Sequence, residues 1–390
     1  MASSLKNKLN ALKKAQGTPR PAQKRGGLRM MREVFPMPEG LTCLNESGLL
    51  PIGWEGRRFD LGRACFLDTE TTGLSGGAGT VAFLVGVGFC MGDGFCVDQF
   101  FMSDYSDEPE MLVELSRLLE KFDSVITFNG NRFDLPLLSS RFLMNRLPDA
   151  VKSLQPLDLL LSARRLWKLR LGSCRLANLE ERVLGIHREN DLPGSEVPQR
   201  YFDFIKTGDA SLVDDIIRHN KQDIVTLGRL LAVLSDSYGA PEQLNDRMDL
   251  FSVGKALEKQ GNLAGAGKVY RIAARPKPVT TISDLIGERY AGEANLRLFA
   301  MYRRSREYDK AMQTLLNMVD RKQGGHVPLV ELAKLEEHAY RNYEAALSWA
   351  LRARECAPQS QQEALIHRIA RLRARIESKR NSEGKHNGNV

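Results

Sequence analysis

The sequence has no cysteines at zinc-ligand spacing, no apolar stretch long enough to cross a bilayer and no apolar leader after Met1. Its six cysteines are scattered, without a Cys-x-x-Cys pair, which favours reduced thiols in a cytoplasmic protein. The longest apolar run, TVAFLVGVGFCM at 80–91, is too short for a membrane span and has the composition of a buried strand. We therefore expect neither secretion nor a transmembrane helix.

The bulk composition predicts a globular protein with a polyanionic partner. A chain of 390 residues exceeds one ordinary compact core, so two domains with tails are expected. The hydrophobic content of 42% is that of a folded domain. A net charge of +8 and a pI near 9.1 make nucleic acid the leading candidate partner.

Four regions follow from the pattern along the chain. Residues 1–35 form a basic segment that we expect to be a disordered tail, and residues 376–390 read as a second tail. In residues 36–240, short apolar runs such as ACFLDTE and SVITFNG indicate strands. The strands come first in a meander and then alternate with longer helical segments. This alternation predicts an α/β domain with a mixed sheet flanked by helices.

Residues 245–375 have helical periodicity throughout and contain two segments that align with each other. Tyr308 and Tyr343, and likewise Ala311 and Ala346, are 35 positions apart. This spacing resembles the stacked helical hairpins of tetratricopeptide repeats. An ordinary helical bundle with alanine contacts is the alternative interpretation of the same pattern.

The stretch FLDTETTGL at 66–74 places two carboxylates, Asp68 and Glu70, at the end of an apolar strand. Residues i and i+2 of a strand project from one face, so both acids point the same way. Two like charges at that range repel each other unless protons or a cation intervene. The pair alone is weak evidence, because a strand end that runs into solvent would look the same.

Two later stretches could supply further acids to the same place. ITFNGNRFDLPLL at 126–138 carries a strand into a helix with Asp134 at the junction, where it could also be only a helix cap. In IIRHNKQDIVTL at 216–227, His219 and Asp223 are four residues apart and share a helix face. They could equally form an exposed local pair.

The order of these motifs resembles the exonuclease branch of the ribonuclease-H-like superfamily, whose members hold metals with four acids abbreviated DEDD. Residues 63–235 look more specifically like the YprB-type predicted exonucleases, which combine this domain with C-terminal tetratricopeptide-like repeats. The stretches DTETTGLSGGAGTVAFLVGVG, LDLLLSARRLW, RLANLEERVLG and HNKQDIVTL also carry the likeness.

The resemblance implies a hydrolase, a DEDD-type exonuclease acting with 3′→5′ polarity on DNA or RNA. Asp68, Glu70, Asp134 and Asp223 would bind two Mg²⁺ or Mn²⁺ ions, because hard oxygen ligands select such cations. His219 would be the general base or orient the attacking water. One departure stands out: the family has His-x4-Asp or Tyr-x3-Asp, and here His219 occupies the tyrosine spacing.

Substrate contacts are expected from three stretches around these acids, with a single-stranded end as the expected substrate. A groove for single strands would combine cations with an aromatic ring, although Trp167 could instead lie in the core behind a solvated helix face. The candidate substrate-binding residues are Thr71, Thr72, Gly73, Leu74, Asn129, Phe133, Arg164, Arg165, Trp167 and Arg175.

The leading hypothesis from the sequence is thus a metal-dependent nuclease. The main alternative is a non-catalytic scaffold that binds nucleic acid and recruits a protein partner through its helical repeats. In a third interpretation, peptide recruitment by the repeats is the main function. The sequence leaves open DNA against RNA, cleavage polarity, exo- against endonuclease action, the pathway and the oligomeric state.

Overall fold

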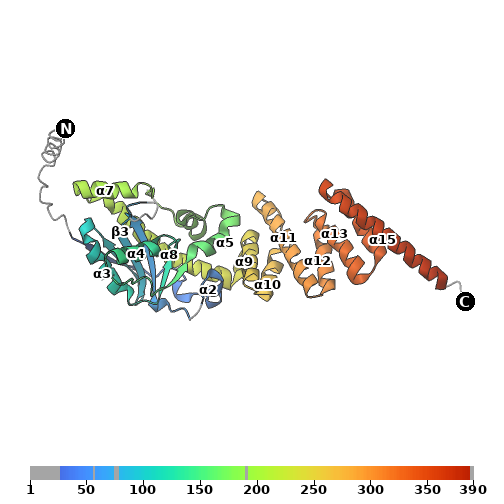
Figure 1. Cartoon of the computed structure of the whole chain (residues 1–390), viewed down its shortest axis with the longest axis horizontal. Helices are drawn as coiled ribbons and strands as arrows, with labels where there is room; N and C mark the ends of the chain where they lie inside the picture. The colour runs from blue at the N-terminus through green and yellow to red at the C-terminus, as the bar shows by residue number, and fades with distance from the viewer. Residues whose placement is uncertain (1–26, 56–57, 74–78, 189–191, 387–390) are drawn as a thin grey trace, which may run out of the picture. The chain divides into compact units, whose positions relative to one another are not determined.

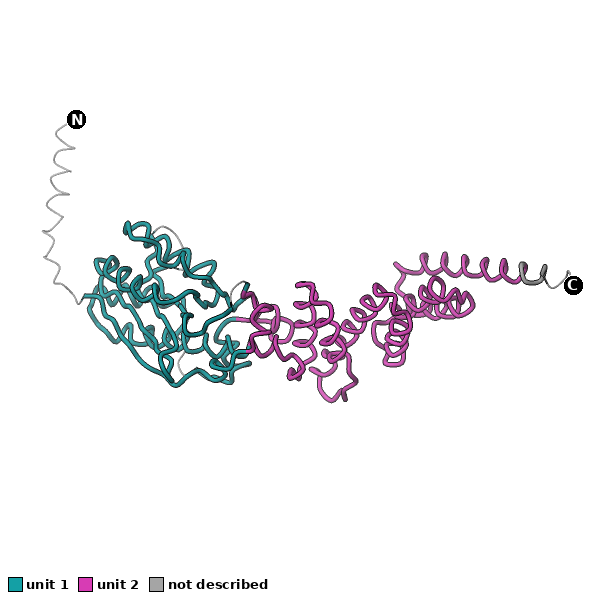
Figure 2. Tube along the Cα trace, turned by 90° about the horizontal axis from the view of Figure 1, so that it is seen from below, with its two compact units in different colours: residues 1–44, 55–160, 175–233 teal, residues 45–54, 161–174, 234–390 magenta. Residues whose placement is uncertain are grey.

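The computed structural model describes residues 27–55, 58–73, 79–188 and 192–386, with side chains up to residue 381. The chain divides into two compact units (Figure 2). Unit 1 contains residues 1–44, 55–160 and 175–233, and unit 2 contains residues 45–54, 161–174 and 234–390. Segments 45–54 and 161–174, which we expected in the first domain, therefore belong to unit 2.

Unit 1 is built on a six-stranded mixed sheet in the order β1-β4-β3-β2-β5-β6. Figure 1 labels β3 of this sheet and the helices α3, α4, α7 and α8. Neighbours β1, β4, β3 and β2 pair antiparallel, whereas β5 pairs parallel with both β2 and β6. The predicted mixed sheet is confirmed. The strands are β1 (Arg29–Pro36), β2 (Ala64–Thr71), β3 (Ala82–Met91), β4 (Gly94–Phe101), β5 (Ser124–Thr127) and β6 (Gln155–Asp158).

Alternate side chains of β2 point into different surroundings. Cys65 and Leu67 belong to a large core cluster that includes apolar side chains of α3, α4 and α7. The alternate residues, including Asp68, lie on the face that α8 covers, since Asn220 of α8 contacts Asp68 and Gly86. The helices of unit 1 are α3 (Glu108–Leu119), α4 (Asp134–Met144), α6 (Leu176–Leu179), a π-helical turn (Glu180–Leu184), α7 (Val197–Thr207) and α8 (Ser211–Gly239, to residue 233), with short 3₁₀ turns at Leu41–Cys43, Leu61–Arg63 and Tyr105–Asp107.

The predicted tails are shorter than expected. Residues 1–26 lie outside the described residues, but Arg29–Pro36 form β1, because Arg32 pairs with Asp98 on the neighbouring strand and β1 adds to the sheet edge. At the other end, residues 376–386 continue helix α15. Ile376, which is 8% exposed, extends the apolar stripe of that helix beyond the predicted boundary.

Unit 2 is a series of helices in which each packs against the next from α9 to α15. Ala266, Ala311 and Ala346 are each the fourth residue of a helix, in α10, α12 and α14, and are fully buried. The predicted all-α region is confirmed, and its tetratricopeptide character stays a prediction. The helices are α2 (Glu46–Ile52), α5 (Leu159–Leu171, from residue 161), α9 (Arg247–Lys259), α10 (Leu263–Ala273), α11 (Ile282–Arg304), α12 (Tyr308–Asp320), α13 (Val327–Leu335), a π-helical turn (Glu336–Tyr340), α14 (Tyr343–Cys356) and α15 (Gln359–His386), with a 3₁₀ turn at Pro241–Gln243.

Across the parts of the chain that the structure describes, no helix combines the length and apolar character that a bilayer crossing requires.

Candidate active site

Asp68 and Glu70 lie on β2 near the middle of the sheet, as the sequence pattern predicts. Asp68 pairs in register with Gly86 of β3, and Gly86 pairs with Gln99 of β4. The register between β2 and β3 shifts after Glu70, so the ladder becomes irregular directly beyond the second acid. Such irregularities redirect side chains at sheet ends and are frequent beside active sites.

An amide network fixes Asp68 beneath helix α8. Asn220 donates hydrogen bonds from Nδ2 to Asp68 Oδ2 at 2.9 Å and to the Asp68 carbonyl at 3.3 Å. Its own Oδ1 accepts from Gln99 Nε2 at 2.8 Å, and Gln99 also donates to the carbonyl of Ile217. A Cβ at Gly86 would come within 2.3 Å of Asn220 Oδ1, so only glycine leaves room for this amide. The network joins β2 and β4 to helix α8, across the space that Gly86 of β3 leaves open.

Asp134 occupies the first turn of α4 and accepts a hydrogen bond from the hydroxyl of Thr69 on β2. The turn before α4 is fixed by Asp158, which is 8% exposed at the end of β6. Its carboxylate accepts from the backbone N–H of Asn129 at 2.8 Å and of Asn131 at 3.3 Å. Asn129 has a left-handed backbone with φ of 71°. Asp158 therefore orients the loop that presents Asp134.

Asp223 and His219 share one face of α8, and His219 Nε2 lies 3.5 Å from Asp223 Oδ2. Arg188 contacts both residues: it donates to Asp223 Oδ1 and lies 3.0 Å from His219 Nδ1. The same guanidinium donates to Glu180, which is fully buried and also accepts from the Thr226 hydroxyl. This buried chain of charges orients the two motif residues of α8.

The four acids interact electrostatically although they come from three distant segments. Burial, together with the charges of Asp223, Asp134 and Glu70, raises the pKa of Asp68 well above its usual range. Burial and the charges of Asp223 and Asp134 raise the pKa of Glu70 to about 8. Burial raises the pKa of Asp134 to about 6, against the lowering effect of the Thr69 hydrogen bond. Burial also raises the pKa of Asp223, which His219 and Arg188 oppose.

This donor set fits a divalent cation by its chemistry. Carboxylates are hard oxygen ligands of the kind that Mg²⁺ and Mn²⁺ prefer, and a cation would offset the repulsion that raises these pKa values. Within the described residues, however, no three His, Cys, Asp or Glu side chains already form a metal cage. Asn220, Thr69 and Arg188 hold three of the acids by hydrogen bonds instead.

Thr71, Thr72 and Gly73, predicted to contact the substrate, form hydrogen bonds at the end of β2. The Thr71 hydroxyl donates to the Gly73 carbonyl at 2.8 Å, and Thr72 Oγ1 accepts from the Val81 N–H at 3.0 Å. Leu74 lies outside the described residues. A contact of Thr71, Thr72 and Gly73 with a nucleotide remains a prediction.

On the other side of the acids, Phe133 immediately precedes Asp134 and is 52% exposed. A contact of its ring with a substrate remains a prediction. Asn129, in contrast, contributes through its backbone, which Asp158 holds. The structure thus places both predicted residues on the loop that carries Asp134.

The predicted single-strand groove around Trp167 needs a correction. Trp167 is 2% exposed, so its ring packs in the interior and cannot stack on a base. Arg164 and Arg165 are exposed on the same helix, α5, in unit 2, whereas Arg175 is exposed at the start of α6 in unit 1. Phosphate binding by these three arginines remains a prediction.

Sequence reasoning missed the polar residues that support the acids. Asn220 stands next to His219, yet its role depends on the pairing of Gly86, which appears only in the folded sheet. Glu180 lies in RLANLEERVLG, which carried the family likeness without indicating a role, and Arg188 gave no signal, because their meeting with Asp223 depends on a loop conformation. The missed residues are Thr69, Gln99, Asp158, Glu180, Arg188, Asn220 and Thr226.

Residues 65–235 match the family model of the RNase_H superfamily. The matched segment contains all four acids and most of unit 1. With the mixed sheet and its flanking helices, this match gives the region a ribonuclease H-like fold, as the sequence resemblance implies. Residues 65–235 are therefore similar in sequence to the RNase_H superfamily, and their fold is ribonuclease H-like.

One relative is similar along almost the whole chain. The "Uncharacterized protein YprB" of Bacillus subtilis (strain 168) is 29% identical over 375 residues, covering 92% of this chain and 85% of that protein. The family B DNA polymerase from the hyperthermophilic archaeon Pyrobaculum calidifontis has 15% sequence identity and a TM-score of 0.37. That match covers 59% of this chain and 32% of the polymerase, so the chain spans about a third of its length.

Proposed function

We propose that this chain is a metal-dependent nuclease that hydrolyses phosphodiester bonds of DNA or RNA, as a DEDD-type 3′→5′ exonuclease. The observation that carries the proposal is the electrostatic coupling of Asp68, Glu70, Asp134 and Asp223 in one place. Half-buried acids whose charges raise the pKa of Asp68 and Glu70 destabilise a fold unless a ligand uses them. The RNase_H superfamily match supports the same class of chemistry.

In this proposal the four carboxylates would hold two Mg²⁺ or Mn²⁺ ions. When bound, such ions lower the pKa of water and neutralise the charge of a phosphate. The protein's own contribution is to keep the acids in position through Asn220, Thr69 and Arg188. Phe133 would lie against the terminal base or sugar, since its ring is exposed next to Asp134.

His219 has a constrained role in this arrangement. A guanidinium has only donors, so His219 Nδ1 accepts from Arg188 and a neutral ring carries its proton on Nε2. The ring therefore offers a donor toward Asp223, and it can accept a proton from water only after the Arg188 contact opens. Orientation of the attacking water by Nε2–H is the role that this geometry favours.

The deciding experiment follows single-stranded DNA and RNA oligonucleotides labelled at either end, with Mg²⁺, Mn²⁺ or EDTA. We expect metal-dependent shortening from the 3′ end, abolished in Asp68→Asn and retained in Asp214→Asn, whose side chain is exposed on the same helix as Asp223. Equal activity in both variants would refute the assignment. Metal-independent binding without cleavage would favour a nucleic-acid scaffold. A cytoplasmic location, expected from the sequence, belongs to this proposal as well.

A further inference from the structure

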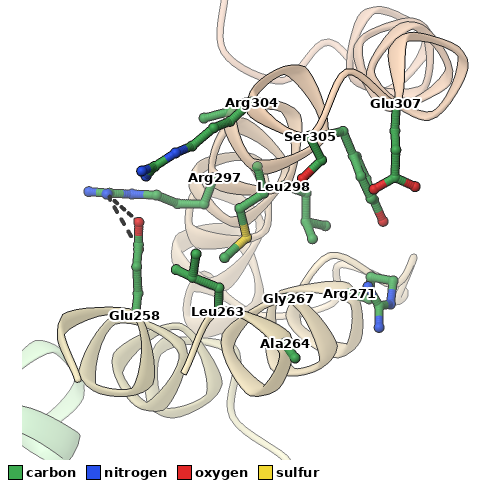
Figure 3. Close-up of a pocket in the computed structure, with 13 residues that line it drawn as sticks. Glu258, Leu263, Ala264, Gly267, Arg271, Arg297, Leu298, Arg304, Ser305 and Glu307 are labelled. Carbon is green, nitrogen blue, oxygen red and sulfur yellow. Dashed lines mark hydrogen bonds and ion pairs between the residues drawn. The ribbon is translucent and has the colours of Figure 1, made fainter. Parts of the chain in front are cut away.

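Unit 2 contains a groove that is separate from the acid cluster. It has a volume of about 490 Å³ and lies between α10 and the C-terminal end of α11, with Glu258 of α9 at its edge. The two small residues Ala264 and Gly267 on α10 leave the space open (Figure 3). A volume of this size is in the range of ligand-binding pockets.

The floor of the groove is apolar and aliphatic. Leu263, Leu298 and Met301 line it, and Leu263 remains 45% exposed. A Cβ added at Gly267 would lie 3.8 Å from the sulfur of Met301, which is an ordinary van der Waals contact. Since Gly267 has no side chain, the groove is bounded there by the backbone of α10. Methionine adapts its shape to different partners, which suits a surface that receives an apolar side chain.

Arginines lie toward both ends of this floor. Figure 3 shows Arg297 and Arg304 near Glu258, and Arg271 on the opposite side near Glu307. The two glutamates already have partners: Glu258 accepts from Tyr270 at 2.8 Å and contacts Arg297 at 3.5 Å, and Glu307 pairs with Lys310. Arg271 and Arg304 have no ion-pair partner in the described part of the chain. They are the cations available to a ligand.

We propose that this groove binds a peptide segment of another protein in which acidic residues flank an apolar side chain. The apolar side chain would cover Ala264 and Gly267, and the carboxylates would bind Arg271 and Arg304. Charge-assisted hydrogen bonds to guanidinium are among the stronger polar contacts in proteins. This proposal is independent of the nuclease activity.

Two observations favour a peptide over a nucleic-acid strand. The floor offers aliphatic side chains instead of a free aromatic surface, since Lys310 already lies 5.7 Å from the centre of the Tyr302 ring. Sites for single-stranded nucleic acid stack successive bases mainly on aromatic side chains. In addition, Glu258 and Glu307 on the rim would repel a continuous phosphate backbone, whereas separate carboxylates can each reach one arginine.

The test exposes the full-length protein to a randomised library of short synthetic peptides and sequences those retained. We expect enrichment of Asp or Glu on both sides of an apolar position. The best peptide, labelled with fluorescein, is then titrated by anisotropy against the wild type and Arg271→Ala/Arg304→Ala. Affinity should fall by about tenfold or more in the variant. Higher salt should weaken binding as well.

The matched control is Arg354→Ala/Arg373→Ala, which removes two exposed arginines outside the groove and should change affinity less than about twofold. Gly267→Leu fills the groove and should abolish binding, with thermal melting to verify folding. Lack of enrichment, or binding unchanged in the Arg271→Ala/Arg304→Ala variant, would overturn the proposal. An oligothymidylate bound with the same arginine dependence would assign the groove to nucleic acid instead.

Discussion

The guanidinium of Arg188 lies 3.0 Å from Nδ1 of His219 and also donates to Asp223, so one side chain holds both α8 residues of the candidate site. The same guanidinium also forms an ion pair with Glu180, whose side chain is fully buried. The orientation of the two motif residues therefore depends on an ion pair that the sequence motif does not include. Several measurable consequences follow from this and related contacts.

Removal of Arg188 should destabilise unit 1 strongly. Arg188→Met leaves the buried Glu180 carboxylate without its cation, and breaking a buried pair from one side costs about 3–5 kcal/mol. Urea denaturation measures the loss. Arg63→Ala is the control, because its pair with Asp123 is solvent-exposed and should contribute little to stability. Similar losses in the two variants would show that Glu180 finds another partner.

Neutralising Asp68 should have opposite effects with and without metal. Without divalent ions, Asp68→Asn removes repulsion from Glu70 and Asp223 and should raise the melting temperature. With Mn²⁺ at a hundredfold its dissociation constant, the wild type should gain about 2.7 kcal/mol, and the variant little. Thermal melts and calorimetry of Mn²⁺ binding follow both effects. An equal Mn²⁺ shift in the two proteins would exclude Asp68 as a ligand.

His219→Ala should lower turnover by about 10²-fold, because the attacking water loses the group proposed to orient it. Calorimetric Mn²⁺ binding should remain close to wild type, because Asp223 still retains its contact with Arg188. His338→Ala serves as the control, since His338 is 61% exposed in unit 2. Undiminished turnover in His219→Ala would make this residue structural.

Two glycines should respond to alanine in opposite directions. At Gly86 the new Cβ would come within 2.3 Å of Asn220, so Gly86→Ala should destabilise by about 1–3 kcal/mol and weaken metal binding. At Gly267 the nearest atom is 3.6 Å away, and alanine in this helix should stabilise by about 0.5–1 kcal/mol. Denaturant midpoints compare the pair. A neutral Gly86→Ala would mean that Asn220 can move.

Asp284, in the N-terminal capping box of α11, should have a carboxyl pKa below its usual value. Hydrogen bonds from Thr281 and Thr280 lower the pKa of Asp284 to about 2. Because an unfolded aspartate titrates near 3.9, this contribution to stability is complete above that pH and disappears as the pH falls toward 2. Carbon-13 NMR of the side-chain carboxyl measures the titration. In Thr281→Ala the pKa should rise, and an unchanged value would assign the shift elsewhere.

The sequence predicted the elements whose signals are local. The apolar strands, the two acids on β2 and the α8 face with His219 and Asp223 follow from periods of two and 3.6 residues. The fold class was predicted correctly for the same reason. The sequence separation of Asp68 from Asp134 and Asp223 does not indicate that these acids are close in space. Only the family resemblance predicted that they share one site.

The remaining features depend on tertiary contacts. Arg32 looked like part of a basic tail because its partner, Asp98, is 66 residues away. Trp167 could have faced a groove or the core, since an amphipathic helix does not reveal what covers its apolar face. Asn220 requires glycine opposite it on β3, and this matching exists only once the strands are paired.

The bond between Asn220 and Asp68 joins residues 152 positions apart. At a synthesis rate of about 5–20 residues per second, Asp68 would leave the ribosome roughly 8–30 s before Asn220. During that interval the nascent chain carries the first two carboxylates without the helix that completes their surroundings. The set of side chains at the candidate site would then be complete only after translation has passed α8.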